Sequence, residues 1–146
     1  MPDRASALEP EGRLTELPRE ECLRRLARGA AGIGRIAVAA PGWPPVIRPV
    51  NYGFDEASQA IVFRSARGSK LTALLLAEQV AFEIDGAQEG DRLGWSVVVV
   101  GSAEEVTNAA ERERLEKLGV RPWSDEEKPH WLRIRTTVVS GRAIVR

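Results

Sequence analysis

Cysteine and histidine are almost absent from this sequence, which has one of each among its 146 residues. The single cysteine, Cys22, excludes a disulfide within the chain, and we expect it in the core of a protein from a reducing cytoplasm. The single histidine, His130, falls in a polar stretch, so we expect a surface loop residue rather than a metal ligand. The sequence therefore offers no Ser/His/Asp set, no Cys/His pair and no metal cluster for catalysis.

Net charge and long apolar runs are lacking as well. Lys and Arg together number 21, as do Asp and Glu, so no overall field draws the chain to nucleic acid or to an anionic membrane. No apolar run comes near the roughly 20 residues that span a bilayer, and the acidic, proline-containing N-terminus is unlike a signal peptide. We therefore expect a soluble, cytoplasmic protein without nucleic-acid or membrane partners.

The hydrophobic pattern predicts one mainly β domain over residues 17–146, preceded by a loose, polar N-terminal arm over residues 1–16. A helix is predicted from Pro18 to Gly29, and another over 109–118 behind an N-cap at Asn108. The predicted strands cover 33–39, 46–54, 61–63, 80–85 and 92–106, followed by a last strand or hairpin that turns at Ser140-Gly141. The absence of βαβ alternation favours a small antiparallel barrel, in which Val97–Val100 would be buried on both sides.

Three local patterns bear on chemistry. Residues 32–37 match the GxGxxA dinucleotide fingerprint, but a helix precedes them and a strand follows, which is the reverse of the order that a Rossmann fold needs. Pro49 cannot donate to a β-ladder, so its strand is an edge, a bulge or a place that faces a ligand. Glu83 and Asp85 share one face of a strand, which favours a solvated pair over an acid–base pair.

A cationic turn joins a strand to a helix within Ile61–Gln79. It gathers three cations and two hydroxyls, on Arg64, Ser65, Arg67, Ser69 and Lys70. Ser69 is placed to cap the following helix, whose first amides are free to bind an anion such as phosphate. These residues alone are equally consistent with a solvent-facing turn and an ordinary helix cap.

Four segments in this order resemble the pyridoxamine 5'-phosphate oxidase-like family. They are P-V-N-Y at 49–52, F-R-S-x-x-G-S-K-L at 63–71, V-A-F-E-I-D at 80–85 and G-W-S-V at 94–97. The resemblance covers roughly residue 32 to the C-terminus. It implies an FMN-binding split β-barrel, antiparallel and Greek-key-like, with flanking helices and a cofactor groove that a second subunit of a homodimer completes.

The resemblance also implies which residues hold the cofactor, FMN. These are Arg48, Pro49, Val50, Asn51, Arg64, Ser65, Ser69, Lys70, Trp95 and Ser96, with Trp131, Arg133 and Arg142 as candidates of second rank. For Trp95, a core position is an equally good interpretation.

The expected function is that of an FMN-dependent oxidoreductase acting on a small molecule, because the flavin itself carries the redox chemistry. Two alternatives stay open: a deazaflavin-dependent reductase on the same fold, and a non-catalytic flavin- or haem-binding protein. Pyridoxamine 5'-phosphate itself is not predicted as the substrate, because the sequence reveals no second phosphate site.

Overall fold

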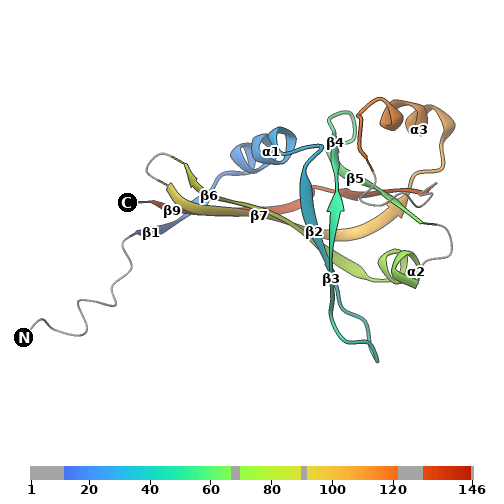
Figure 1. Cartoon of the computed structure of the whole chain (residues 1–146), viewed down its shortest axis with the longest axis horizontal. Helices are drawn as coiled ribbons and strands as arrows, with labels where there is room; N and C mark the ends of the chain where they lie inside the picture. Colours follow the sequence, from blue (N-terminus) through green and yellow to red (C-terminus); the bar gives the residue numbers. More distant parts are fainter. Residues whose placement is uncertain (1–11, 67–69, 90–91, 122–129, 146) are drawn as a thin grey trace, which may run out of the picture.

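The computed structural model describes residues 12–66, 70–89, 92–121 and 130–145, which contain three helices and nine strands (Figure 1). The helices are α1 (Arg19–Arg28), α2 (Lys70–Ala77) and α3 (Ala109–Glu116). The strands are β1 (Arg13–Leu17), β2 (Ile33–Val38), β3 (Val46–Asn51), β4 (Gly53–Asp55), β5 (Ala60–Ser65), β6 (Gln79–Glu89), β7 (Arg92–Glu105), β8 (His130–Arg135) and β9 (Val138–Val145). Sequence periodicity therefore predicted the central strands and all three helices.

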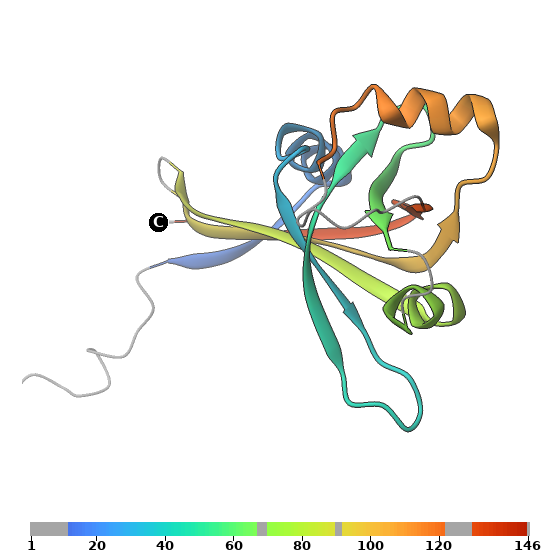
Figure 2. The ribbon, with the colours of Figure 1, turned by 45° about the vertical axis from the view of Figure 1, so that its right-hand side comes forward.

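The strands form one curled antiparallel sheet in the order β3-β2-β6-β7-β8-β5-β4, and β9 and β1 extend it beside β7. β3 and β4 stand at the two ends of this order, and β3 contacts β5 across the opening between those ends. Figure 2 shows the sheet wrapping around the interior, with the β2–β3 hairpin projecting beyond it. The predicted split barrel with flanking helices is thus confirmed as the architecture.

Tyr52 breaks the single strand that we predicted over residues 46–54. Its backbone N–H donates to the carbonyl of Gly32 at 3.1 Å, and its carbonyl accepts from the N–H of Ala31 at 2.7 Å. These bonds tie the chain to the turn after α1, so β3 ends at Asn51 and β4 begins at Gly53. The interruption separates the two ends of the sheet and creates the seam of the barrel.

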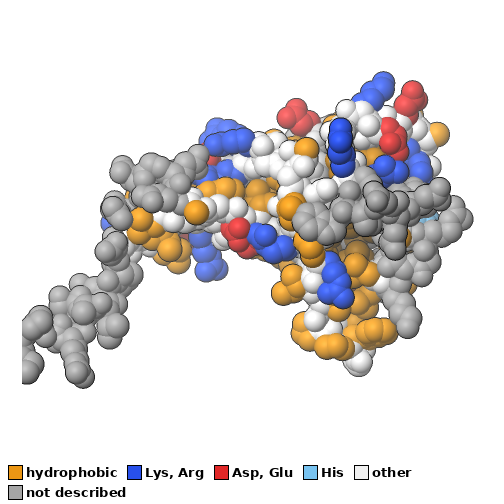
Figure 3. Space-filling view, in the orientation of Figure 1, with side chains coloured by type: hydrophobic (Ala, Val, Ile, Leu, Met, Phe, Trp, Pro, Cys, Tyr) orange, Lys and Arg blue, Asp and Glu red, His pale blue; other side chains and the backbone are white. Residues whose placement is uncertain are grey.

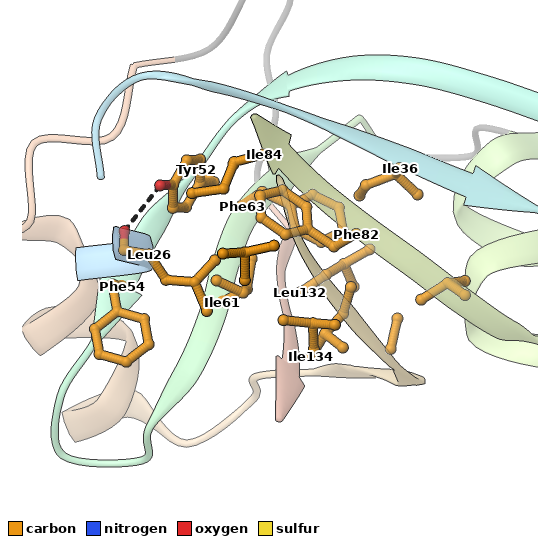
Figure 4. Close-up of a cluster of buried hydrophobic side chains, with 14 of the residues drawn as sticks. Leu26, Ile36, Tyr52, Phe54, Ile61, Phe63, Phe82, Ile84, Leu132 and Ile134 are labelled. Atoms are coloured by element: carbon orange, nitrogen blue, oxygen red, sulfur yellow. Dashed lines mark hydrogen bonds between the residues drawn. The ribbon is translucent and has the colours of Figure 1, made fainter. Parts of the chain in front are cut away.

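The core fills the inside of the curl and includes side chains from α1 and from strands β2 to β9 (Figure 4). Tyr52 is fully buried, and its hydroxyl donates to the carbonyl of Leu26 at 2.8 Å. Burial raises the pKa of this hydroxyl, which keeps it protonated as a donor. The Tyr52 ring also packs edge-on against Phe82, with 4.9 Å between ring centroids. Cys22 is buried in the same cluster, as predicted.

The N-terminal arm is only partly as expected. Residues 1–11 lie outside the described residues, but Arg13–Leu17 forms β1, which pairs with β9 from Arg13 opposite Val145 to Leu17 opposite Gly141. The prediction of a loose arm is therefore wrong for residues 13–16. β1 is largely exposed, and its two leucines, Leu14 and Leu17, are three residues apart, which is not the alternation that predicts a strand.

The valines of β7 are not buried on both sides, which corrects another prediction. Val97 and Val99 point into the core and are fully buried, whereas Val100 points outward and is 37% exposed. The sheet is a single layer whose concave side alone is covered by the core, so alternate residues of β7 lie on an uncovered outer side.

This outer side, which we call the open face, carries an apolar row across five strands. Strand register places one residue from each strand in line: Ile47, Ala37, Ala81, Val100 and Val138, from β3, β2, β6, β7 and β9. Ile47 and Val138, at the two ends, are 62% and 60% exposed. Figure 3 shows further hydrophobic surface at the β2–β3 hairpin, where Trp43 is also exposed.

The last two strands lie one after the other along the same edge of β7, instead of folding back at Ser140-Gly141. The interruption occurs at Thr136, whose hydroxyl donates to the carbonyl of Gln59 at 2.7 Å. β9 runs straight through Gly141, where an added Cβ would lie 2.7 Å from the Cys22 sulfur. The glycine therefore serves the packing of α1 on β9, and not a turn.

Asp55, the last residue of β4, is a buried charged residue. Its carboxylate receives two hydrogen bonds from Arg114 of α3, at 2.8 and 3.2 Å, and one from the Ser58 hydroxyl at 2.5 Å. Burial alone would raise the pKa of Asp55, but these hydrogen bonds and the charge of Arg114 outweigh it, so the pKa is lowered. The pair fixes α3 to the end of the barrel.

We expect Asp55 to make the protein sensitive to acid. A lowered pKa in the folded state contributes stability that is complete above the unfolded pKa of about 4 and is lost as pH falls through the folded value. Between pH 5 and pH 3, the free energy of unfolding measured with urea should therefore fall by about 1–2 kcal/mol more in the wild type than in Asp55→Asn. Parallel losses in the two proteins would contradict this role of Asp55.

Candidate functional site

The corner between β5 and α2 brings two hydroxyls together at the predicted anion-binding turn. Ser65 ends β5, and its hydroxyl is hydrogen-bonded to that of Thr72 in the first turn of α2. Thr72 also lies 3.3 Å from the carbonyl of Ala66, to which it can donate. α2 starts at Lys70, so the corner adjoins helix amides that lack intrahelical partners. Arg67, Ser69 and the side chain of Lys70 lie outside the described residues.

Arg64 does not share this corner with Ser65. Successive residues of a strand point to opposite sides, and Arg64 lies on the side that packs against α3. Its guanidinium carbon is 5.4 Å from the ring centroid of Trp131, which is buried and donates from its indole nitrogen to Glu116 at 2.9 Å. A cation over an indole ring is a favourable contact, which explains this orientation. Arg64 stays a predicted phosphate ligand, but the structure places it apart from Ser65.

The edge strand β3 forms the other side of the seam. Pro49 is exposed on this strand, in agreement with the prediction that its strand is an edge. Arg48 is exposed and donates only to the neighbouring carbonyl of Ile47 among the contacts described, at 2.9 Å. Asn51 donates to the carbonyl of Arg121 at 2.6 Å, and Val50 packs against the core. The outer edge of β3 therefore presents backbone groups next to the β5–α2 corner.

Trp95 and Ser96 lie at the opposite end of the molecule, near the start of β7. The guanidinium carbon of Arg25 is 4.6 Å from the centroid of the Trp95 ring. The other side of this ring covers Gly86, where an added Cβ would lie 2.4 Å from the indole nitrogen. Trp95 and Ser96 line an open cavity of about 330 Å³ together with Arg142, one of the candidates of second rank.

The predicted cofactor residues thus fall into two groups within one chain. Ser65 is the ladder partner of His130 of β8. His130 lies two residues before Leu132, which is the ladder partner of Glu105 at the end of β7. Ser96 lies nine residues before Glu105 on the same strand, which corresponds to about 30 Å at 3.3 Å per residue. One flavin mononucleotide does not reach along that length of strand, so a single chain does not assemble both groups around one cofactor.

The other second-rank candidates point away from the β5–α2 corner. Arg133 is on the side of β8 that faces α3, where it donates to Glu111 at 3.1 Å and lies 3.6 Å from Glu104. Trp131 belongs to the small cluster under α3. Both residues therefore help to hold α3 in place.

His130 is a residue of this region that the sequence analysis missed. It does not belong to a loop but opens β8, and its Nδ1 is hydrogen-bonded to the carboxylate of Glu105. The alternation of His130 with Leu132 and Ile134, which are both buried in the core, was the available signal for a strand. It places His130 on the same side of the sheet as Ser65.

Glu83 and Asp85 do share one side of β6, as predicted, and both are bound to Arg35 of β2. The Arg35–carboxylate distances are 2.6 and 2.8 Å. This ion cluster lies on the open face, beside the apolar row.

The described part of the chain contains no group of three or more His, Cys, Asp or Glu side chains that could hold a metal ion. None of its helices is long and apolar enough to cross a membrane.

Comparisons with known proteins agree with this architecture. The family described as pyridoxamine 5'-phosphate oxidase matches residues 18–143. An uncharacterised protein of Mycobacterium tuberculosis is 30% identical over 137 residues, which cover 90% of this chain and 86% of that protein. Among solved structures, the FAD binding protein from Mycobacterium smegmatis is 28% identical, with a TM-score of 0.71 and coverage of 90% of this chain and 99% of that one.

A conserved protein of unknown function from Corynebacterium diphtheriae is similar as well. It is 32% identical, with a TM-score of 0.72 and coverage of 90% of this chain and 98% of that one. Because the family match extends over most of the sequence and the structure has the matching split barrel, this chain belongs to the pyridoxamine 5'-phosphate oxidase family.

Proposed function

We propose that this protein binds a flavin nucleotide at the seam of its barrel and uses it in an oxidation or reduction of a small molecule. The observation that carries the proposal is the β5–α2 corner, where the Ser65 and Thr72 hydroxyls adjoin the first amides of α2. Hydroxyls and free helix amides are suitable ligands for a phosphate group. The likeness to an FAD binding protein over nearly all of that chain gives independent support.

The residues at the seam fit such a cofactor. Ser65 and the start of α2 would hold the phosphate, together with Ser69 and Lys70. The exposed edge of β3 from Arg48 to Asn51 would lie along the ring, because an unpaired strand edge offers backbone donors and acceptors. When bound, the flavin supplies the transfer of hydride or electrons, while the chain binds and orients it.

FMN is the cofactor that we propose, and FAD is the alternative that the similarity to an FAD binding protein favours. FAD contains the same ring, ribityl chain and first phosphate, so the corner would hold either molecule by the same contacts. FAD would need additional room for its adenylate.

The identity of the cofactor is tested by the visible absorbance of the purified protein and by the mass of whatever it releases on denaturation. A flavin spectrum with the mass of FMN is the expected result. A deazaflavin or haem would replace the proposed chemistry, and a colourless protein that also fails to bind added FMN and FAD would refute it. Reduction by a nicotinamide or another donor, followed by reoxidation with turnover, would distinguish an oxidoreductase from a flavin-storage protein.

We also propose that the protein acts as a homodimer, with the open face as the interface. The apolar row from Ile47 to Val138 lies uncovered, and a cluster of both charge signs around Arg35 adjoins it. A face that carries both features is suited to a two-fold contact with a second copy. A second copy could also bring its Trp95 and Ser96 to a cofactor held at the corner, which one chain alone cannot do.

Lys70→Ala is expected to weaken flavin binding. A charged hydrogen bond to phosphate contributes about 1.5–3 kcal/mol, so the Kd for FMN should rise roughly tenfold to a hundredfold. Lys117→Ala removes the same charge at the end of α3 and serves as the matched control. Fluorescence titration with FMN measures both variants, and equal affinities for FMN would contradict the assignment of Lys70.

A further inference from the structure

Four polar side chains form a cluster at the end of the barrel beside α2, which we call the mouth cluster. They make two hydrogen-bonded pairs, Ser65 with Thr72 and His130 with Glu105. Ser65 and His130 are direct partners across β5 and β8. Direct partners in an antiparallel ladder have their Cβ atoms about 4.5–5.5 Å apart and point to the same side. The two pairs therefore adjoin each other.

Strand alternation shows that the mouth cluster is the polar rim of the core. Phe63 and Leu132 are partners one step earlier on the same side, and both are buried in the core. Ser65 and His130 are the next residues outward from them on that side. Ala103, which is also buried in the core, precedes Glu105 in the same way on β7.

Few charged side chains of the described residues lie near His130. Three nearby charged residues point to the opposite side of the sheet, because each is an odd number of residues from a member of the cluster on the same strand. They are Arg64 of β5, Glu104 of β7 and Arg133 of β8. α2 contributes Thr72. Among the described side chains of these four elements, Glu105 is therefore the one ionisable group that faces His130. Of the two described basic residues Arg64 and His130, it is His130 that lies on the same side of the sheet as Ser65.

The pair with Glu105 orients the imidazole. A carboxylate oxygen accepts the hydrogen bond, so Nδ1 of His130 is the donor and Nε2 is left for a second contact. In the neutral ring Nε2 is an acceptor, whereas in the imidazolium it carries a proton and donates. Only the second form attracts an anion.

We propose that His130, held by Glu105, is a further binding residue for the flavin phosphate and that protonation of its imidazole tightens this binding. The inference rests on the proposed function, because it requires a flavin phosphate at Ser65. It makes cofactor retention depend on pH, because only the protonated ring carries the charge that attracts a phosphate.

The test is a fluorescence titration of the full-length, flavin-free protein with FMN and with riboflavin, at pH 6.5 and 8.5. Riboflavin has the ring and the ribityl chain but no phosphate. For the wild type, the Kd for FMN should rise about tenfold between the two pH values, as expected for loss of a charged hydrogen bond, while the Kd for riboflavin stays constant. The phosphate itself is largely doubly ionised throughout this range and would change binding in the opposite direction.

Two variants separate the binding role from a structural one. His130→Gln should remove the pH dependence for FMN and leave riboflavin affinity unchanged. Glu105→Gln should also weaken FMN binding and leave riboflavin affinity unchanged, because the amide no longer holds the ring through a charged hydrogen bond. An FMN pH dependence that persists in His130→Gln would overturn the proposal, and so would an equal loss of riboflavin binding. A wild type that binds neither ligand at either pH would instead refute flavin binding itself.

Discussion

Val100→Asp should convert the proposed homodimer into a monomer. Val100 lies within the apolar row of the open face, between Ala81 of β6 and Val138 of β9. In a two-fold interface the substitution would bury two carboxylates, one from each subunit, in apolar surroundings. Burial of an unpaired polar group costs at least about 2 kcal/mol, so two copies should weaken association roughly a thousandfold.

The same substitution tests whether the interface completes the cofactor site. Flavin content per chain should fall as the fraction of dimer falls, because Trp95 and Ser96 of one subunit would no longer reach the β5–α2 corner of the other subunit. Sedimentation at several protein concentrations measures the first effect, and the ratio of flavin to protein absorbance measures the second.

Val100→Thr and Thr107→Asp are the matched controls. The first keeps the shape of valine without a charge, and the second adds the same charge at an exposed residue after β7. Both should remain dimeric. A wild type that is monomeric at all concentrations would refute the open face as an interface, and a dimer that retains flavin in Val100→Asp would place the interface elsewhere.

Local periodicity predicted strands such as β2 and β6 because their inward and outward residues alternate. The split barrel was predicted from the resemblance of four short motifs to the pyridoxamine 5'-phosphate oxidase-like family. What sequence did not predict was the side of the sheet to which a charged residue turns. Arg64 and Ser65 are neighbours in the motif, yet one contacts Trp131 of β8 and the other contacts Thr72 of α2.

The sequence also did not predict the positions of residues that are held by backbone pairing or by partners distant in the chain. β1 lacks alternating apolar residues and is held by its ladder with β9. His130 was predicted as a loop residue because its partner, Glu105, belongs to another strand. The burial of Val100 was overestimated for a related reason. Its exposure depends on what covers the open face, and a run of valines does not specify whether that cover is the same chain or a second one.

Phe82→Ala should cause a large loss of folding stability. Phe82 is fully buried at the centre of the curl, where its ring contacts Tyr52 and lies over the backbone of Gly34. An added Cβ at Gly34 would be 2.2 Å from the tip of this ring, so the glycine leaves space that the ring fills. Truncation of a buried phenylalanine costs about 3–5 kcal/mol.

We expect a loss of stability in the upper part of that range, because the neighbouring residues cannot move to fill the cavity left by the ring. Gly34 has no side chain that could move into it, and Tyr52 is held in place by the hydrogen bond from its hydroxyl to Leu26. Unfolding of the flavin-free protein in urea, at one fixed protein concentration, measures the difference without contributions from ligand or association. Phe82→Leu, which keeps most of the volume, should cost only about 1–2 kcal/mol. Equal losses in the two variants would mean that the ring does not fill this space in solution.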